Sequence, residues 1–291
     1  MIPINITLEE RKIFTDTLEK IVSEISPEKI ICFGSRTDYH ESWSNFLPTG
    51  NMNYFTYYDI LIATKEANVQ KEHEILEKIA AYNKGPIHIT ALVHSMATVN
   101  KAILKGNPFF VTVYKKGMIV YDSENVPLSI PDKELDVKKL NIRAERHWQQ
   151  LFGLAEVYFS RGLNTRWDQN EIALFMFHQS VEYACQAIIK YCTGYRPMTH
   201  DLKRLLFLME NFIDEKIMVF SDEQETKDID TLFNIYKDVR HCRKCKVYNP
   251  TIGIVRSRVR RFLEIVAKIH DEKKKLLKEL ARELPTSPVK E

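Results

Sequence analysis

A change of pattern near residue 130 constrains the fold of this chain more than any other feature. Before it, strand-like apolar runs alternate with helix-like segments. After Leu135 almost no strand signal remains, and at least five helix-sized segments follow. Because 291 residues are enough for two ordinary domains, the pattern predicts an α+β protein, with an N-terminal α/β domain around a small mixed sheet and a C-terminal all-α domain.

The domain boundaries are predicted from the prolines and from the composition around this change. Pro127 and Pro131 bracket a short connecting segment. We therefore expect the first domain over residues 1–126, a linker over 127–134, a helical bundle over 135–283 and a frayed tail over 284–291.

The first candidate site lies where two strand-like runs face each other. The run at residues 30–33 is expected to break at a turn formed by Gly34, Ser35 and Arg36, and Asp59 opens the second run. Such a turn exposes backbone N–H groups, which suit a phosphate. Asp59 would hold Mg²⁺ against the phosphate oxygens, because Mg²⁺ sites combine one or two carboxylates with substrate phosphates.

The other elements of the first domain are predicted from apolar spacing and turn residues. The capping box that starts at Thr7 begins the first helix. We expect a helix over 8–25, a long loop over 43–54, a helix over 67–81, a strand over 87–93, a helix over 97–105, and a hairpin with strands at 109–114 and 118–121.

The second domain is predicted as a helical bundle around one central helix. Residues 172–192 are apolar on nearly all sides, which favours the centre of the bundle. His178 and Glu182 are four residues apart on this helix and share a face. The other helices are expected around residues 140–159, 200–212, 221–240 and 252–280.

The first domain carries a family resemblance. The sequence FGSR at residues 33–36, followed by DILI at residues 59–62, resembles the signature of the minimal nucleotidyltransferases of the polymerase-beta and kanamycin-nucleotidyltransferase superfamily. The resemblance implies that the predicted turn binds a nucleoside triphosphate and that Asp59 binds Mg²⁺. The implied reaction transfers a nucleoside monophosphate to a hydroxyl group of a protein, an RNA or a small molecule.

The metal site of that family needs a pair of carboxylates. They stand in an Asp-x-Asp pair, where they bridge two metal ions. This chain has Tyr57 two residues before Asp59 and Leu61 two residues after it, and neither side chain is an ordinary Mg²⁺ ligand. A carboxylate from the preceding segment, Asp38 or Glu41, would restore the pair if the segment folded back.

The second domain resembles another family. FHQSVEYA at residues 177–184, with THDL at residues 199–202, is similar to the HEPN family, whose bundles often follow a minimal nucleotidyltransferase. The resemblance implies an antiparallel bundle that commonly forms a homodimer. Some members act as metal-independent ribonucleases through an Arg-x4-6-His motif, and members without the motif are read as nucleotide or RNA binders.

The ribonuclease motif is incomplete in this chain. Arg240 stands where the arginine is expected, but the histidine positions hold Cys245, Lys246 and Val247, and His241 is adjacent to the arginine. Because RNA cleavage needs a base and an acid that titrate near neutrality, we expect no cleavage from this domain.

The densest basic region of the chain surrounds this position. Arg240, His241, Arg243 and Lys244 form the candidate basic site, and four arginines follow between residues 256 and 261. Such a cluster would contact the phosphates of RNA or nucleotides. The alternative is a solvated helix surface, since apolar residues between the arginines supply the core-facing side.

Two functions remain open from the sequence. The first is a nucleotidyltransferase. The second is a catalytically degenerate binder of nucleotides or RNA that acts as a sensor or as the partner in a toxin–antitoxin-like pair. The chain has five cysteines without a disulfide spacing, and it shows no signal-peptide pattern. It also has no run of about 18 apolar residues. These features predict a cytoplasmic protein without a membrane partner. The net charge of +3 is too small to indicate a nucleic-acid partner by itself.

Overall fold

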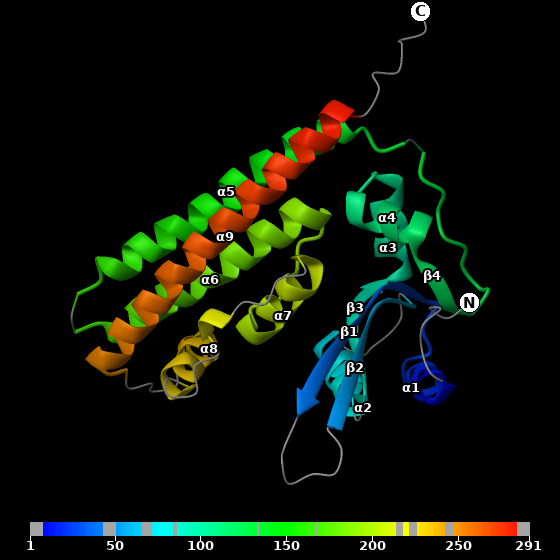
Figure 1. Cartoon of the computed structure of the whole chain (residues 1–291), viewed down its shortest axis with the longest axis horizontal. Coiled ribbons are helices and arrows are strands. Elements are labelled where there is room, and N and C mark those ends of the chain that lie inside the picture. Colours follow the sequence, from blue (N-terminus) through cyan, green and yellow to red (C-terminus); the bar gives the residue numbers. More distant parts are fainter. Residues whose placement is uncertain are drawn as a thin grey trace, which may run out of the picture. The chain divides into compact units, whose positions relative to one another are not determined.

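The protein has two compact units, Met1–Leu135 and Asp136–Glu291. The computed structural model describes residues 8–42, 51–65, 72–83, 86–132, 134–166, 168–213, 218–220, 226–241 and 247–283. The first unit contains a mixed sheet and helices, and the second is helical, so the predicted α+β class is confirmed (Figure 1).

The sheet of the first unit has four strands in the order β3-β2-β1-β4. β1 (Lys29–Ser42) pairs with β2 (Asn51–Thr64) and with β4 (Met118–Asp122) in antiparallel orientation. β3 (Ile87–Ser95) is parallel to β2, as a crossover through the helix α2 (Glu72–Tyr82) allows. The mixed character of the sheet follows from this single crossover.

Alternate residues of the central strands divide the unit into two cores. Tyr58, Ile60 and Ile62 of β2 pack with the apolar faces of α1 (Leu8–Ile25) and α2. The residues between them point to the opposite face of the sheet. There, α3 (Met96–Leu104) and α4 (Pro108–Lys116) cover one part, through contacts such as that between Phe33 and Phe109.

The predicted turn at residues 34–36 is wrong. β1 runs through these residues, and Gly34, Ser35 and Arg36 pair with consecutive residues of β2. The only irregularity at this point is a register shift between Cys32 and Gly34, which leaves Phe33 as an extra residue. The small residues therefore accommodate a bulge within the strand, and their N–H groups belong to a ladder and not to an open turn.

Two further predictions in this unit need correction. Residues 109–114 are helical in α4, because Asn107 caps the helix and Pro108 occupies its first position. The aromatic and β-branched residues that suggested a strand are buried against the sheet instead. The predicted loop over 43–54 is also too long, since β2 begins at Asn51; Thr7 and residues 43–50 lie outside the described residues.

The second unit is built from long helices. Asp136 caps α5 by accepting a hydrogen bond from the Lys139 N–H at 3.1 Å, and Gly194 ends α6 in the left-handed conformation with φ 78°. The elements are α5 (Val137–Leu163), α6 (Asn170–Thr193), α7 (Leu202–Ile213), the short 3-10 helix η1 (Met218–Phe220), α8 (Thr226–Arg240) and α9 (Asn249–Glu283).

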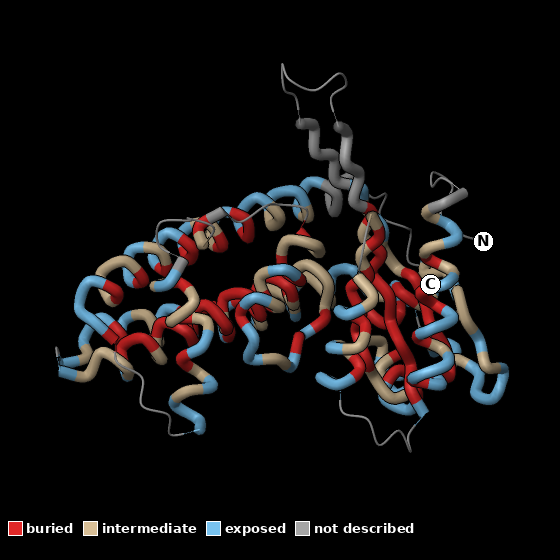
Figure 2. Tube along the Cα trace, turned by 90° about the horizontal axis from the view of Figure 1, so that it is seen from below, coloured by how far each residue is buried: buried red, intermediate tan, exposed pale blue. Residues whose placement is uncertain are grey.

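The predicted central helix is confirmed. α6 contacts α5, α7, α8 and α9 and is buried along most of its length. Buried residues, red in Figure 2, line both the strands of the sheet and the interior of the helices. Because α6 is surrounded on all sides, the polar side chains that it carries must find partners inside the bundle.

Candidate functional site

Asp59 lies between two small residues on the flanking strands. Gly34 of β1 and Thr90 of β3 stand directly opposite it. A Cβ atom at Gly34 would lie 2.9 Å from Asp59 Oδ2, so the carboxylate occupies the space over the glycine. The side chain is mostly buried, at 9% exposure. The glycine is therefore needed for the position of this carboxylate and not for a turn.

A row of cationic and aromatic side chains crosses the sheet next to Asp59. Arg36, Tyr57 and His88 are paired across β1, β2 and β3. The Arg36 Cζ atom lies 4.5 Å from the centroid of the Tyr57 ring, and the Tyr57 and His88 rings stack with centroids 5.1 Å apart. Tyr57 and Asp59 are two residues apart, so the row shares a face with the carboxylate.

The structure brings together two of the three residues of the predicted phosphate site. Gly34 and Arg36 lie on the face of Asp59, whereas Ser35 pairs with Tyr58, whose side chain points to the opposite core. The serine is exposed at the surface. A phosphate cradle made from all three residues does not fit a continuous strand.

The described side chains around Asp59 do not supply enough donors for a pair of metal ions. In the described part of the chain, no group of three or more His, Cys, Asp or Glu residues is placed to hold a metal. Leu61 is fully buried in the core. The side chains of Asp38 and Glu41 lie outside the described part. One carboxylate matches a Mg²⁺ ion carried by a triphosphate, but not the two-metal arrangement.

In the helical unit, Glu182 is the centre of a buried polar network. Gln179 Nε2 donates to its Oε2 at 3.2 Å, and Gln186 Nε2 donates to its Oε1 at 3.1 Å. His200 Nδ1, from the segment before α7, lies 3.0 Å and 3.1 Å from the two oxygens. With only 4% of its side chain exposed, the carboxylate uses both oxygens within the bundle.

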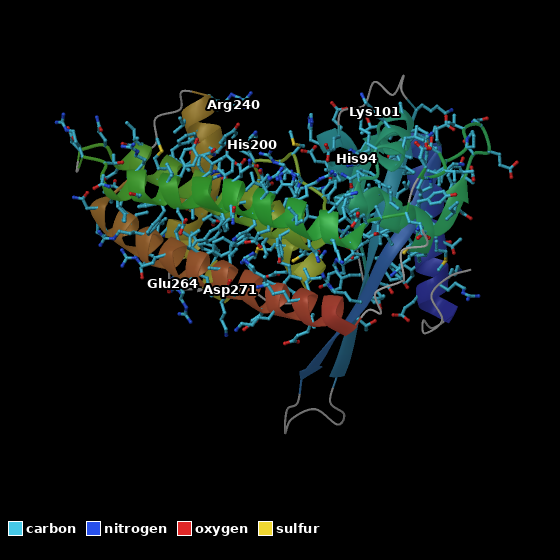
Figure 3. All side chains as sticks on the ribbon, turned by 90° about the horizontal axis from the view of Figure 1, so that it is seen from above. His94, Lys101, His200, Arg240, Glu264 and Asp271 are labelled. Atoms are coloured by element: carbon cyan, nitrogen blue, oxygen red, sulfur yellow. The ribbon has the colours of Figure 1, made fainter. Side chains whose placement is uncertain are left out.

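The network continues to the surface through α8. The His200 ring stacks on Tyr236 with centroids 4.4 Å apart and an angle of 19°. Arg240, one helical turn later, donates from Nη1 to the Tyr236 hydroxyl oxygen at 2.7 Å. Half of the His200 side chain is exposed, and Arg240 is exposed. Figure 3 labels both residues. A buried carboxylate is thus connected through two stacked rings to a solvent-facing guanidinium.

A second histidine, His178, lies beside Tyr236 in the interior of the bundle. Burial lowers the pKa of His178 to about 3; the nearby His200 acts in the same direction and the His200 backbone carbonyl acts against it. His178 is fully buried and its ring lies 5.4 Å from that of Tyr236. It is neutral at neutral pH and supports the stack from inside.

The predicted basic residues are only partly described. Arg240 ends α8, and the exposed His241 follows it, with its N–H bound to the carbonyl of Lys237. Arg243 and Lys244 lie outside the described residues. Three residues of this network were not predicted from the sequence, namely Tyr236, Gln179 and Gln186. A signal for the two glutamines was present, because they flank Glu182 at helical spacing in an otherwise apolar helix.

Comparison with known families identifies the helical unit. The model of the HEPN domain matches residues 162–277, from the end of α5 to α9. The C-terminal unit therefore contains a HEPN domain, and the site around Glu182 lies within it. We call Glu182, His200, Tyr236 and Arg240 the HEPN-unit site. The match does not include the first unit, whose resemblance to nucleotidyltransferases stays a prediction. A comparison with curated proteins finds no match. None of the described helices is long and apolar enough to cross a membrane.

Proposed function

We propose that this protein binds RNA or nucleotides at the HEPN-unit site without cleaving them. The observation that carries the proposal is the continuous path from the buried Glu182 to the exposed Arg240, through His200 and Tyr236. It fixes a cation and an aromatic pair at the surface of a domain whose family is associated with nucleotide and RNA functions.

The chemistry of the site suits a phosphate next to a base. Arginine presents a planar set of donors that matches phosphate oxygens, and its contact with Tyr236 limits the orientations that it must lose on binding. Aromatic faces stack on bases regardless of sequence. The half-exposed ring of His200, held by Glu182, supplies a further donor or acceptor at the same place.

Cleavage is not part of the proposal, because the histidine of the ribonuclease motif is missing. Attack by a ribose 2′-hydroxyl needs a base, and departure of the leaving oxygen needs an acid. The positions five to seven residues after Arg240 hold Cys245, Lys246 and Val247 in place of histidine, and His178 is buried and neutral. In this proposal the protein acts as a sensor or as the binding partner in a toxin–antitoxin-like pair.

Removal of the exposed guanidinium tests the proposal. We expect Arg240→Ala to weaken the binding of a fluorescently labelled single-stranded RNA by about tenfold. We also expect the slope of log affinity against log salt concentration to become shallower by about one unit, the amount that corresponds to one phosphate contact. Fluorescence anisotropy at several salt concentrations measures both quantities, and a gel of the recovered RNA checks that it stays intact.

Lys237→Ala is the matched control, because Lys237 is an exposed cation one turn earlier on the same helix and takes no part in the network. We expect it to change the affinity by less than about twofold. Equal losses in the two variants would show that any cation of α8 serves, which contradicts a defined site. Degraded RNA on the gel would overturn the absence of cleavage.

A second candidate function is nucleotide binding in the first unit. The observation that favours it is the row of Arg36, Tyr57 and His88 beside Asp59, which offers a cation and aromatic faces next to a carboxylate. A triphosphate would bring its Mg²⁺ to Asp59, while a base stacks along the row. Transfer of the nucleotide to an acceptor hydroxyl is the further step that the resemblance implies.

Calorimetric titration of ATP and GTP, with and without Mg²⁺, tests this second candidate. We expect binding to depend on Mg²⁺ and to weaken at least about tenfold in Asp59→Asn, which is about 1.4 kcal/mol. Asp16→Ala, in which an exposed carboxylate of α1 is removed, is expected to bind like the wild type. Binding that is independent of Mg²⁺ and of Asp59 would contradict the metal-assisted site.

A further inference from the structure

A pocket lies between the first turns of α5 and the last turns of α9, away from the HEPN-unit site. It has a volume of about 460 Å³, within the range of small-molecule sites. Its floor includes Tyr191 of α6, and its walls come from both long helices. The lining includes Ile142, Glu145 and Arg146 of α5 and Lys274, Leu277 and Lys278 of α9.

The floor of this pocket is held rigid by stacked rings. Trp148 and His270 stack with centroids 4.0 Å apart and an angle of 1°, and Tyr191 meets His270 edge-on at 4.6 Å. All three side chains are buried. The aromatic group therefore joins α5, α6 and α9 and fixes the Tyr191 side chain as an apolar floor.

One carboxylate in the wall is already neutralised. Glu145 accepts a hydrogen bond from Lys274 Nζ at 2.7 Å, and its other oxygen lies 3.3 Å from Nε2 of the buried His270. Although burial acts to raise it, contacts with Lys274 and His270 keep the pKa of Glu145 below its usual range. The acid thus stays ionised and uses its charge within the wall.

The other two charged residues on the wall, Arg146 and Lys278, are positive. Arg146 and Lys278 are exposed and form no salt bridge with any residue in the described part of the chain. The positive charge of Arg146 also acts on the neighbouring His147. Burial lowers the pKa of His147, and the charges of Lys190, Arg143 and Arg146 lower it further. An apolar floor lies under an excess of cations.

We propose that this pocket binds a small organic anion. Its apolar or aromatic body rests on Tyr191 between Ile142 and Leu277, and its anionic group is neutralised by Arg146 and Lys278. A charged group that binds over an apolar floor gains from both the burial of its body and the loss of repulsion between the cations.

The dimensions of the pocket favour a small molecule over a folded partner. Its lining on α5 runs from Asn141 to Gln149, a length of about 12 Å at the rise of an α-helix. The lining on α9 is shorter, from Lys274 to Lys278. An interface with a folded protein needs a far larger surface on each partner.

The fluorescent sulfonate 8-anilinonaphthalene-1-sulfonate is a suitable probe, because it joins an anionic group to an aromatic body. Titrated into the full chain, it is expected to bind with enhanced emission, and Arg146→Glu and Lys278→Glu are each expected to weaken this binding by about fivefold. Competition with octanoate and with phenyl phosphate then identifies the preferred head group: displacement by octanoate indicates a carboxylate, and displacement by phenyl phosphate indicates a phosphate.

One control separates this pocket from general effects. Lys275→Glu makes the same charge change on an exposed residue of α9 that does not line the pocket. It is expected to bind the probe like the wild type. The proposal is overturned if the wild type does not bind the probe, if both lining variants bind it unchanged, or if Lys275→Glu weakens binding as much as they do. Circular dichroism confirms that each variant is folded.

Discussion

Replacement of Glu182 with alanine is expected to lower the free energy of unfolding of the helical unit by about 3 kcal/mol. The change removes the acceptor of Gln179 and Gln186 and the partner of His200 in one step. Both glutamines are buried, so their N–H groups lose a hydrogen bond that water does not replace. The loss of contacts of the side chain itself adds to the cost.

Urea denaturation followed by circular dichroism at neutral pH measures this difference. Glu264→Ala is the control, because Glu264 is an exposed carboxylate of α9, labelled in Figure 3, and its removal is expected to change stability by less than about 0.5 kcal/mol. If the two variants were equally stable, Glu182 would not be the centre of the network. A loss of RNA binding in Glu182→Gln, with folding intact, would further link the buried carboxylate to the orientation of His200.

Much of the helical unit could be predicted from its sequence, because burial and helical spacing act on neighbouring residues. The apolar run at residues 172–192 identified the central helix within a few residues of α6. His178 and Glu182, which were predicted to share a face of this helix, are both buried. In such cases one helix face determines both the local structure and the packing, so a local pattern contains most of the information.

The sheet was harder to predict, because the same residue types in its sequence are compatible with more than one local structure. Gly34 and Ser35 suit a turn, but they also suit a bulge in a strand, and the close approach of the Asp59 carboxylate to Gly34 decides between these in three dimensions. Similarly, Asn107 and Pro108 mark a turn or the start of a helix, and the residues after them carry strand-like side chains. Tertiary burial in α4 outweighs this propensity.

The contacts of the candidate site could not be predicted from the local sequence either. Arg240 was predicted from its charge and its place late in a helix, but nothing in the local sequence pairs it with Tyr236 and His200. His200 comes from a connection between helices, thirty-six residues before the tyrosine on which it stacks. Only the packing of α8 against α6 brings these side chains to the same place. Contacts of this kind depend on the fold and not on sequence spacing.

The second large prediction concerns two glycines of α5, Gly162 and Gly153. Their replacement with alanine is expected to change the free energy of unfolding in opposite directions. A Cβ atom at Gly162 would lie 2.6 Å from Cε1 and 2.9 Å from Cδ1 of Phe177, a fully buried ring of the central helix. Gly162→Ala is therefore expected to lower the free energy of unfolding by about 2 kcal/mol, because the ring has no free space into which to move. At Gly153 an added Cβ meets no atom within 4 Å.

Gly153→Ala is therefore expected to stabilise the same helix by about 1 kcal/mol, since alanine has the higher helix propensity. The two variants add the same methyl group to the same helix, so their difference, about 3 kcal/mol, isolates the contact with Phe177 from the propensity of alanine. Urea denaturation of both variants measures it. If Gly162→Ala were as stable as Gly153→Ala, α5 would not approach α6 as closely as the structure shows. The burial of the α6 side chains, including Glu182, would then have to be reconsidered. A difference near the expected value would show that this close packing of α5 on the central helix forms in solution, on the same helix that carries the polar network.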